Sequence, residues 1–309
     1  MFNLLIMKIT QAITDQESER FDAFLDELRS LGRREKTLNA YACDWQQFSL
    51  WYAETNGEPF DLARLSSIDI QDYKSFLLSR GRSPATVNRR LIFLKRYSRF
   101  GAETGSVRQD LYSAFQKIQG VRCQSLAPKS LEIKQVRRLL KELELLGNVR
   151  DQAILYLFLY TGVRVGELVQ LRKGDADISE RKGSLHIRAE IGKGGRERIT
   201  PLPLEARQRL QAYLETRQDR YDSLFIGQRG PMKEDAIVRI LRKYAERCGI
   251  HVTPHLLRHT FAHQYLDRNQ NDLVGLAAIL GHESLNTTRL YTQKRLEDLQ
   301  KSAEKVGYF

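Results

Sequence analysis

Five side chains in the second half of the chain have types and spacings suited to chemistry on a phosphodiester. Arg164 stands alone, His255 and Arg258 are three residues apart, His282 follows Leu-Gly, and Tyr291 lies nine residues further on. Guanidinium groups can neutralise non-bridging phosphate oxygens, and imidazoles can move protons or donate hydrogen bonds. A phenol can attack phosphorus and remain attached as a phosphodiester. The set predicts a site that holds a phosphate against a tyrosine nucleophile.

The local context of these residues strengthens this prediction. The Thr-Pro pair before His255 predicts a helix start, which places His255 and Arg258 on one face of the first turn. Glu167 follows Arg164 by three residues, so its carboxylate can hold the guanidinium in position. Each signal alone is weak, because surface helices, surface Arg-Glu pairs and core tyrosines produce the same patterns. Only their joint occurrence, in order, points to a site.

A metal site is an alternative interpretation of the histidines. His255, His259 and His263 follow one another at steps of four, a spacing that can chelate zinc or nickel. Three successive turns of one helix do not readily converge on one ion, and no acid follows the first histidine as it does in H-E-x-x-H. The sequence therefore favours a site without metal.

The charge of the chain favours a polyanionic partner. The formal net charge is +12 and the isoelectric point is about 9.6. Residues 1–125 carry 18 basic and 15 acidic side chains, whereas residues 126–309 carry 32 and 23. Most of the excess positive charge therefore lies in the half that contains the predicted chemistry.

The cysteines and the N-terminus predict a cytoplasmic protein. Cys43, Cys123 and Cys248 are scattered and lack the C-x-x-C spacing of a zinc knuckle, and their odd number argues against a disulfide framework. The apolar stretch from Phe2 to Met7 is too short for a secretory signal, and no run approaches membrane-spanning length. A reducing compartment fits best.

The first hundred residues predict a small helical bundle. Breaks rich in glycine and proline separate four helical segments, at 14–30, 36–54, 67–80 and 84–103. The second segment repeats apolar and aromatic residues every three or four positions, which predicts a packed core face of Leu38, Tyr41, Trp45, Phe48 and Tyr52.

The fourth segment carries basic residues around an apolar face. A solvated charged face is one interpretation, but few acids lie nearby to pair these cations, and a helix N-terminus favours phosphate. We therefore expect contacts with the DNA backbone from Arg89, Arg90, Lys95, Arg96 and Arg99.

The second half predicts a mainly helical domain with a small β-sheet. Periodicity weakens between 104 and 129, so we expect a domain at 1–120, a linker at 121–129 and a second domain at 130–309. Strands are expected at 185–191 and 198–202, with Lys193 at the tip of the turn between them. Helices are expected at 131–146, 150–161, 204–219, 233–248, 254–268, 271–280, 286–291 and 294–305.

Four ordered boxes in this half resemble a tyrosine recombinase of the phage integrase family, in the style of the compact Xer recombinases or a TnpI-type transposon resolvase. Gln293 stands where many Xer proteins have histidine, a small departure from that pattern. The boxes are Thr-Gly-Val-Arg164-Val-Gly-Glu167-Leu, Gly-Lys193-Gly, Pro-His255-Leu-Leu-Arg258-His-Thr-Phe and Leu-Gly-His282-Glu-Ser-Leu-Asn-Thr-Thr-Arg-Leu-Tyr291-Thr.

The resemblance implies a catalytic role for each box. Tyr291 would attack the scissile phosphate to form a 3'-phosphotyrosine and release a 5'-hydroxyl. Lys193 would protonate that leaving oxygen, and His255 would accept a proton near the tyrosine. The phosphorane charge would be stabilised by Arg164, Arg258 and His282, with Glu167 orienting the first arginine. No metal, nucleotide or other cofactor is implied, because the phosphodiester energy is retained in the protein-DNA bond.

The resemblance also implies an architecture and partners. The first domain resembles the family's helical, SAM-like core-binding domain, and the second its α+β catalytic domain. Together they would form a C-shaped clamp on double-stranded DNA carrying a specific core site. The helix at 294–305 would dock in trans within a homo-tetramer, or a hetero-tetramer of paralogues, on two DNA sites. A helix that folds back on its own domain is the alternative. The implied location is the cytoplasm, on the nucleoid.

Several functions share these features. A DNA-binding relative without strand transfer would have lost a box, and none is lost. A type IB topoisomerase uses similar groups, but the small helical N-terminal domain and the terminal helix favour site-specific recombination. Among biological roles, the compact chain favours resolution of chromosome dimers or transposon cointegrates, and a mobile-element integrase is the alternative.

Overall fold

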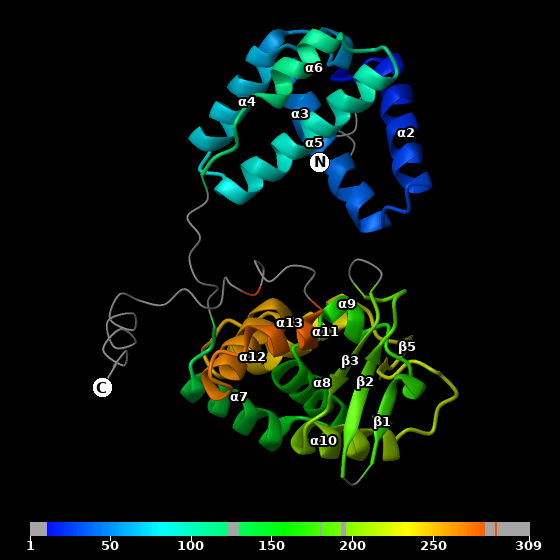
Figure 1. Cartoon of the computed structure of the whole chain (residues 1–309), viewed down its shortest axis with the longest axis vertical. Coiled ribbons are helices and arrows are strands. Elements are labelled where there is room, and N and C mark those ends of the chain that lie inside the picture. The colour runs from blue at the N-terminus through cyan, green and yellow to red at the C-terminus, as the bar shows by residue number, and fades with distance from the viewer. Residues whose placement is uncertain (1–10, 123–129, 180, 193–195, 282–287, 289–309) are drawn as a thin grey trace, which may run out of the picture. The chain divides into compact units, whose positions relative to one another are not determined.

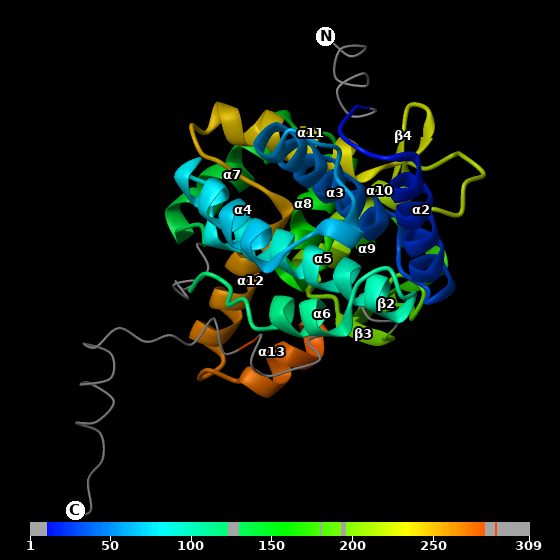
Figure 2. The same ribbon diagram turned by 90° about the horizontal axis from the view of Figure 1, so that it is seen from above.

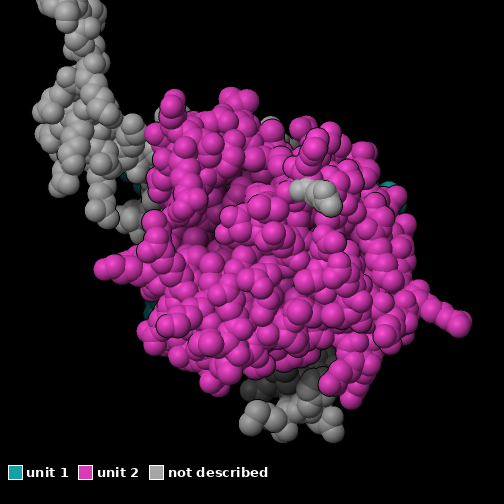
Figure 3. Space-filling model, turned by 90° about the horizontal axis from the view of Figure 1, so that it is seen from below, with its two compact units in different colours: residues 1–124 teal, residues 125–309 magenta. Residues whose placement is uncertain are grey.

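The computed structural model describes residues 11–122, 130–179, 181–192, 196–281 and 288. The chain divides into two compact units, residues 1–124 and 125–309, coloured teal and magenta in Figure 3. The described residues are mainly helical, with one three-stranded and one two-stranded sheet, so the predicted fold class is confirmed. No helix among them is long and apolar enough to cross a membrane.

The first unit is helical throughout its described elements (Figure 1). They are α2 (Asp15–Ser30), α3 (Glu35–Asn56), the 3-10 turn η1 (Leu62–Arg64), α4 (Ser67–Ser79), α5 (Pro84–Glu103) and α6 (Gln109–Gln116). The predicted start of α5 is confirmed, because the Ser83 hydroxyl accepts from the Thr86 amide and Pro84 opens the first turn. The predicted aromatic face of α3 lies in the core, where Trp45 stacks on Phe21.

Helix α6 differs from the prediction, because the sequence pattern predicts no helix between 104 and 129. It has only eight residues and no side-chain N-cap, so its local signal is weak. It forms because Phe115 is fully buried in the core of the first unit. It lies beside α5 in both views (Figure 1 and Figure 2).

Glu17 is a fully buried carboxylate whose hydrogen bonds connect several elements of the first unit. It accepts hydrogen bonds from the Tyr97 hydroxyl at 2.7 Å, the Trp45 indole at 3.2 Å and the Leu62 amide at 3.0 Å, and it pairs with Arg20 at 2.5 Å. These donors come from α3, η1 and α5 as well as α2, so the carboxylate joins elements distant in sequence.

The Glu17→Gln variant is expected to unfold more easily by about 3 kcal/mol, because an amide brings a donor toward donors and removes one of the two carboxylates that pair with Arg20. Urea unfolding of the full chain, followed by tryptophan fluorescence, would measure this loss. Glu19→Gln, an exposed neighbour on the same helix, is the control. Equal stability of the two variants would contradict the prediction.

The second unit surrounds the helix α8 (Val149–Thr161), most of whose residues are buried. Its other described elements are α7 (Ile133–Leu146), α9 (Val165–Leu168), the 3-10 turn η2 (Lys173–Asp175), β1 (Ala176–Ile178), β2 (Gly183–Ile187), β3 (Arg198–Pro201), α10 (Leu204–Glu215), β4 (Ile226–Gly227), β5 (Gly230–Pro231), α11 (Glu234–Arg247), α12 (Pro254–Arg268) and α13 (Leu273–Leu280). Helices α10 and α12 pack against α8 (Figure 1).

The end of α8 is fixed by Gly162. This residue adopts a left-handed backbone conformation with φ of 61°, which L side chains rarely adopt. A Cβ atom there would lie 2.5 Å from the Phe261 ring and 2.7 Å from Leu280. The chain can therefore leave α8 against α12 and α13 only with glycine at this position, and it reaches Arg164 two residues later.

Strands β1, β2 and β3 form an antiparallel sheet in that order, with Leu185 opposite both Ala176 and Thr200. The predicted strand at 185–191 is wrong beyond Ile187. There the Arg188 carbonyl accepts from the amides of Ile191 and Gly192, which turns the chain. Strands β1, β4 and β5 were missed, because strands of two or three residues carry almost no periodicity.

The predicted helices of the second half mostly match the structure. Helix α10 ends at Glu215, not at 219, because the Arg217 guanidinium pairs with Asp219 and donates to the carbonyls of Ser223 and Leu224. Helices α7, α8, α11, α12 and α13 agree to within two residues. The predicted helices at 286–291 and 294–305 lie outside the described residues, apart from position 288.

Candidate active site

Arg164 occupies the N-cap of the short helix α9, directly after the turn at the end of α8. Its side chain is 26% exposed. One guanidinium nitrogen donates to Glu167 Oε1 at 2.9 Å, and its backbone amide donates to Glu167 Oε2 at 2.9 Å. The predicted orientation of Arg164 by Glu167 thus has two contacts, one to the side chain and one to the main chain.

Glu167 also binds a second arginine, which no pattern in the sequence marks as a site residue. Arg198 of β3 donates to Glu167 Oε1 at 3.0 Å and to Oε2 at 2.7 Å, a bidentate pair. Burial opposes ionisation of Glu167, whose side chain is 2% exposed, but the bonds and charge of Arg198, then those of Arg164, hold its pKa below the usual value. Glu167 is therefore an anion between two cations.

Arg258 lies in the first turn of α12, capped by Thr253 as predicted. Its side chain is buried, and the guanidinium donates to the Gly162 carbonyl at 2.6 Å and to the Leu280 carbonyl at 2.8 Å. Gly162 precedes Arg164 by two residues, and Leu280 precedes His282 by two residues. Arg258 thus joins two chain segments that lead directly to other predicted site residues.

The structure places only part of the predicted catalytic set. Arg164, Glu167, His255 and Arg258 are described, and Arg258 contacts the segment that carries Arg164. Three further predicted residues, Lys193, His282 and Tyr291, lie outside the described residues. Two described residues, Gly192 and Gly281, directly precede Lys193 and His282 in the sequence.

The histidines of α12 line one side of the helix. His255 is exposed, and its ring lies 4.1 Å from that of His259, edge to face. Burial, together with the charges of His255, His263 and Arg258, lowers the pKa of His259 to about 4. In the described ranges no three His, Cys, Asp or Glu side chains are arranged to hold a metal ion.

His259 is expected to make the protein less stable as the pH falls. Its ordinary pKa is about 6.5, so between that pH and about 4 the unfolded chain binds a proton that the folded chain excludes. The melting temperature should therefore drop over this window, and less so in His259→Gln. Thermal unfolding at pH 7 and pH 5 measures the difference. His251→Gln, at an exposed histidine, is the control, and identical pH dependence in all three proteins would contradict the prediction.

Two of the basic side chains expected to contact DNA are paired with buried groups. Arg89 forms an ion pair with Asp44 of α3, whose side chain is 1% exposed. Arg90 lies 3.7 Å from the same carboxylate and donates to the Tyr73 hydroxyl at 2.8 Å. The premise that acids are scarce around this helix is wrong, because Asp44 comes from a different helix.

Two further cations of α5, Lys95 and Arg99, have partners as well. Lys95 donates to the carbonyls of Gln116 and Ile118 at 2.9 and 2.7 Å, at the end of α6. Arg99 pairs with Glu103 one turn along α5 at 2.9 Å. Intramolecular contacts therefore hold several of these side chains in place, and their contact with DNA stays a prediction.

Family comparisons cover both units. The phage integrase family model matches residues 129–297, more than half of the chain. The phage integrase N-terminal SAM-like domain model matches residues 21–105. The matched ranges include the described site residues of the second unit and helices α3 to α5 of the first.

Individual relatives agree with this match. The tyrosine recombinase XerA of Thermococcus onnurineus is 31% identical over 272 residues, which cover 77% of this chain and 94% of that protein. The tyrosine recombinase XerD of Listeria innocua is 32% identical over 286 residues, which cover 87% and 93%.

A solved structure supports the same fold. The XerH site-specific recombinase bound to a palindromic difH substrate, in a post-cleavage complex, superposes with a TM-score of 0.72 at 21% identity, covering 87% of this chain and 79% of that chain. The chain therefore belongs to the phage integrase family of tyrosine recombinases and is an Xer-like enzyme that cleaves and rejoins DNA at specific sites.

Proposed function

We propose that Tyr291 is the nucleophile of this recombinase and that Arg164 and Arg258 bind the scissile phosphate. His282 donates a further hydrogen bond to the phosphorane, and His255 accepts the proton of the tyrosine. Lys193 protonates the leaving 5'-oxygen. Glu167 acts through Arg164, as a positioning residue.

The observation that carries this proposal is the pair of hydrogen bonds made by Arg258. They run to the carbonyls of Gly162 and Leu280, in segments 96 and 22 residues away along the chain. Three separate boxes of the sequence therefore meet at one guanidinium. A buried arginine bonded to two main-chain carbonyls keeps its position without substrate, which is the preorganisation that charge stabilisation requires.

The proposed reaction balances without an added reagent. The Tyr291 oxygen forms a bond to phosphorus while the bond from phosphorus to the 5'-oxygen breaks, and the tyrosine proton passes to His255. The 5'-oxygen takes a proton from Lys193 and leaves as a hydroxyl. In the second half-reaction a 5'-hydroxyl of the partner strand attacks the phosphotyrosine, which restores a phosphodiester and the free phenol.

Covalent trapping tests this proposal. The full chain would be incubated with nicked duplexes drawn from its own genomic flank and denatured in SDS, and the DNA-linked peptide would be identified by mass spectrometry. We expect a 3'-linked adduct on the peptide that contains Tyr291, formed in the presence of a chelator. An adduct on another residue, or a 5'-linkage, would contradict the assignment.

The N-terminal unit is proposed as the core-binding domain, comprising residues 1–120, with a linker at 121–129 and the catalytic domain at 130–309. The two domains would then close on duplex DNA as a C-shaped clamp. Among the predicted contacts of α5, the side chains of Arg89 and Arg99 are 48% and 66% exposed and suit phosphate contact, whereas that of Arg90 is 12% exposed and suits a supporting role. The remaining predicted contacts are Lys95 and Arg96.

Resolution of dimers or cointegrates on the nucleoid is the biological role that we propose. The support is that the relatives named above are Xer recombinases and cover 77% and 87% of this chain. Such a reaction joins two DNA sites, which requires a tetramer with one protomer on each half-site.

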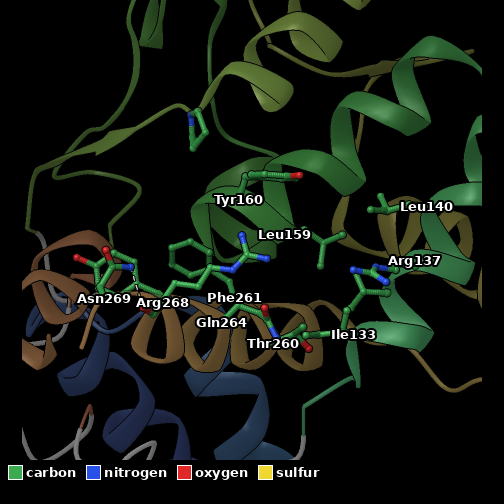
Figure 4. Close-up of a pocket in the computed structure, with 13 residues that line it drawn as sticks. Ile133, Arg137, Leu140, Leu159, Tyr160, Thr260, Phe261, Gln264, Arg268 and Asn269 are labelled. Carbon is green, nitrogen blue, oxygen red and sulfur yellow. Dashed lines mark hydrogen bonds between the residues drawn. The ribbon is translucent and has the colours of Figure 1, made fainter. Parts of the chain in front are cut away.

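A groove in the second unit suits the assembly of that tetramer. It has a volume of about 340 Å³ and lies between α7, the end of α8 and α12 (Figure 4). Its wall contains apolar side chains, Ile133, Leu140, Leu159 and Phe261 among them, and Arg137 and Arg268 also line it. We assign residues 294–305 of a second protomer to this groove. The sequence of that segment contains Leu296 and Leu299, whose apolar side chains would suit the wall, and Glu297 and Asp298, whose charges would suit the arginines.

Removal of residues 293–309 is expected to preserve binding to a single half-site and to reduce the tetramer on paired sites at least ten-fold. Ile133→Glu should do the same by placing a charge in the groove, whereas Leu145→Glu, an exposed apolar residue on the same helix, should not. Native mass spectrometry of the DNA complexes measures the tetramer. Unchanged tetramer yield in the truncated protein would contradict trans docking and favour a segment that folds on its own domain.

A further inference from the structure

Arg198 makes contacts that connect three parts of the second unit. Its guanidinium pairs with both oxygens of Glu167 at 2.7 and 3.0 Å, and its Nε donates to the Ile279 carbonyl at 3.0 Å. The side chain is 9% exposed. The neighbouring Thr200 hydroxyl donates to the same Ile279 carbonyl at 3.3 Å. These contacts connect strand β3 both to α9 and to the last turn of α13.

The guanidinium of Arg198 also covers Gly281. A Cβ atom at Gly281 would lie 2.9 to 3.2 Å from the Arg198 side chain, and the backbone there is left-handed, with φ of 64°. Gly281 directly precedes His282. The left-handed backbone at Gly281, which leads to His282, therefore packs against the Arg198 side chain.

We propose that Arg198 is a positioning residue for recombination, which keeps Arg164 available to the scissile phosphate and fixes the end of α13 before His282. This assignment rests on the proposed roles of Arg164 and His282. Arg198 contacts neither DNA nor the tyrosine in this proposal, since it acts only through Glu167 and the main chain.

The charges of Arg164, Glu167 and Arg198 explain why Arg164 depends on Arg198. Arg164, Glu167 and Arg198 together carry a net charge of +1, and Glu167 divides its four contacts between the two arginines. Without Arg198, the buried carboxylate would be neutralised by Arg164 alone, and the pair would carry no net charge toward the phosphate. Lysine at this position would restore a charge but not the bidentate geometry or the contact with Ile279.

The test compares Arg198→Met and Arg198→Lys with the wild type in single-turnover cleavage of a nicked duplex. On the ordinary phosphodiester we expect a loss of about 100-fold for Arg198→Met and a smaller loss for Arg198→Lys. A second duplex carries a methylphosphonate at the scissile position, which removes the negative charge that Arg164 balances. On that duplex the difference between wild type and Arg198→Met should shrink to about five-fold or less.

Arg217→Met is the matched control. Arg217 is 4% exposed and, like Arg198, pairs with a carboxylate and donates to main-chain carbonyls, but it lies between α10 and β4 and contacts none of the site residues. Its loss should lower the melting temperature and leave the rate per folded molecule unchanged on both duplexes. If Arg198→Met does not fold, the same comparison with Arg198→Lys decides the question.

The possible results separate this assignment from the proposed function. Equal losses on the two duplexes would mean that Arg198 does not act through the charge of Arg164, and a variant as fast as the wild type would mean that it positions neither Arg164 nor the end of α13. Either result would overturn the assignment while leaving the nucleophile in place. A wild-type protein that forms no adduct with DNA would overturn the proposed function and this assignment together.

Discussion

Replacing Tyr291 by phenylalanine is expected to abolish the covalent protein–DNA adduct and strand exchange, while half-site binding stays within about two-fold of the wild type. The substitution removes one oxygen atom, and no other group at that position can attack phosphorus. An unperturbed phenol ionises near pH 10, so the attack depends on proton removal by the surrounding site. Denaturing gel electrophoresis of nicked complexes measures the adduct directly.

The control for Tyr291 is Tyr221→Phe. Tyr221 is 48% exposed in the same unit, so its phenol is available to solvent but lies in no predicted box. Cleavage by this variant should equal that of the wild type. An adduct that persists in Tyr291→Phe would mean that another residue is the nucleophile. Loss of half-site binding would show that the substitution acts through folding.

Replacing Arg258 by lysine is expected to slow cleavage about 1,000-fold. The guanidinium bridges the carbonyls of Gly162 and Leu280 in a planar, fork-like arrangement that one ammonium group cannot reproduce. The variant also loses a buried hydrogen bond, which should lower the unfolding free energy by about 2 kcal/mol. Single-turnover rates, corrected for the folded fraction, separate the two effects.

The control for Arg258 is Arg209→Lys. Arg209 of α10 is 38% exposed and pairs with Glu144, so a lysine there keeps most of a surface contact. Its cleavage rate should be unchanged. A rate for Arg258→Lys within about ten-fold of the wild type would mean that this arginine organises the fold without stabilising the reaction.

Local sequence signals predicted most helix boundaries correctly. Ser83 and Thr253 each accept a hydrogen bond from an amide three residues ahead, and a proline follows each of them at the first helical position. Capping and the fixed φ of proline act within one turn, so a single sequence reveals them. Longer periodic segments such as α3 were predicted for the same reason, because one face repeats many times.

Short elements were harder to predict than long ones. Helix α6 was missed, and the strand expected at 185–191 ends at Ile187. The alternation of residues continues past that point, but the contact of Arg188 with Asp175, at 3.0 Å and 13 residues away, favours a turn. A contact between residues distant along the chain leaves no trace in the local pattern.

The pairing of charged side chains could not be predicted from the sequence either. The cations of α5 were expected to lack acidic partners, but Asp44, 45 residues from Arg89, lies beside them. The sequence pattern predicts only that Arg198 lies in a strand, although its side chain binds Glu167, 31 residues away. No spacing rule connects such residues, because their approach depends on how separate elements pack.

The sequence by itself identified the family and predicted the chemistry: a tyrosine, two arginines, two histidines and a lysine, in boxes with a characteristic order and spacing. Residue type fixes what a side chain can donate, accept or attack, and that property is local. The tertiary structure alone decided which groups hold the two arginines, Arg164 and Arg258, in place. Arg258 lies between Gly162 and Leu280, and Glu167 lies between two arginines, because buried charges and carbonyls must find partners wherever the packed elements provide them.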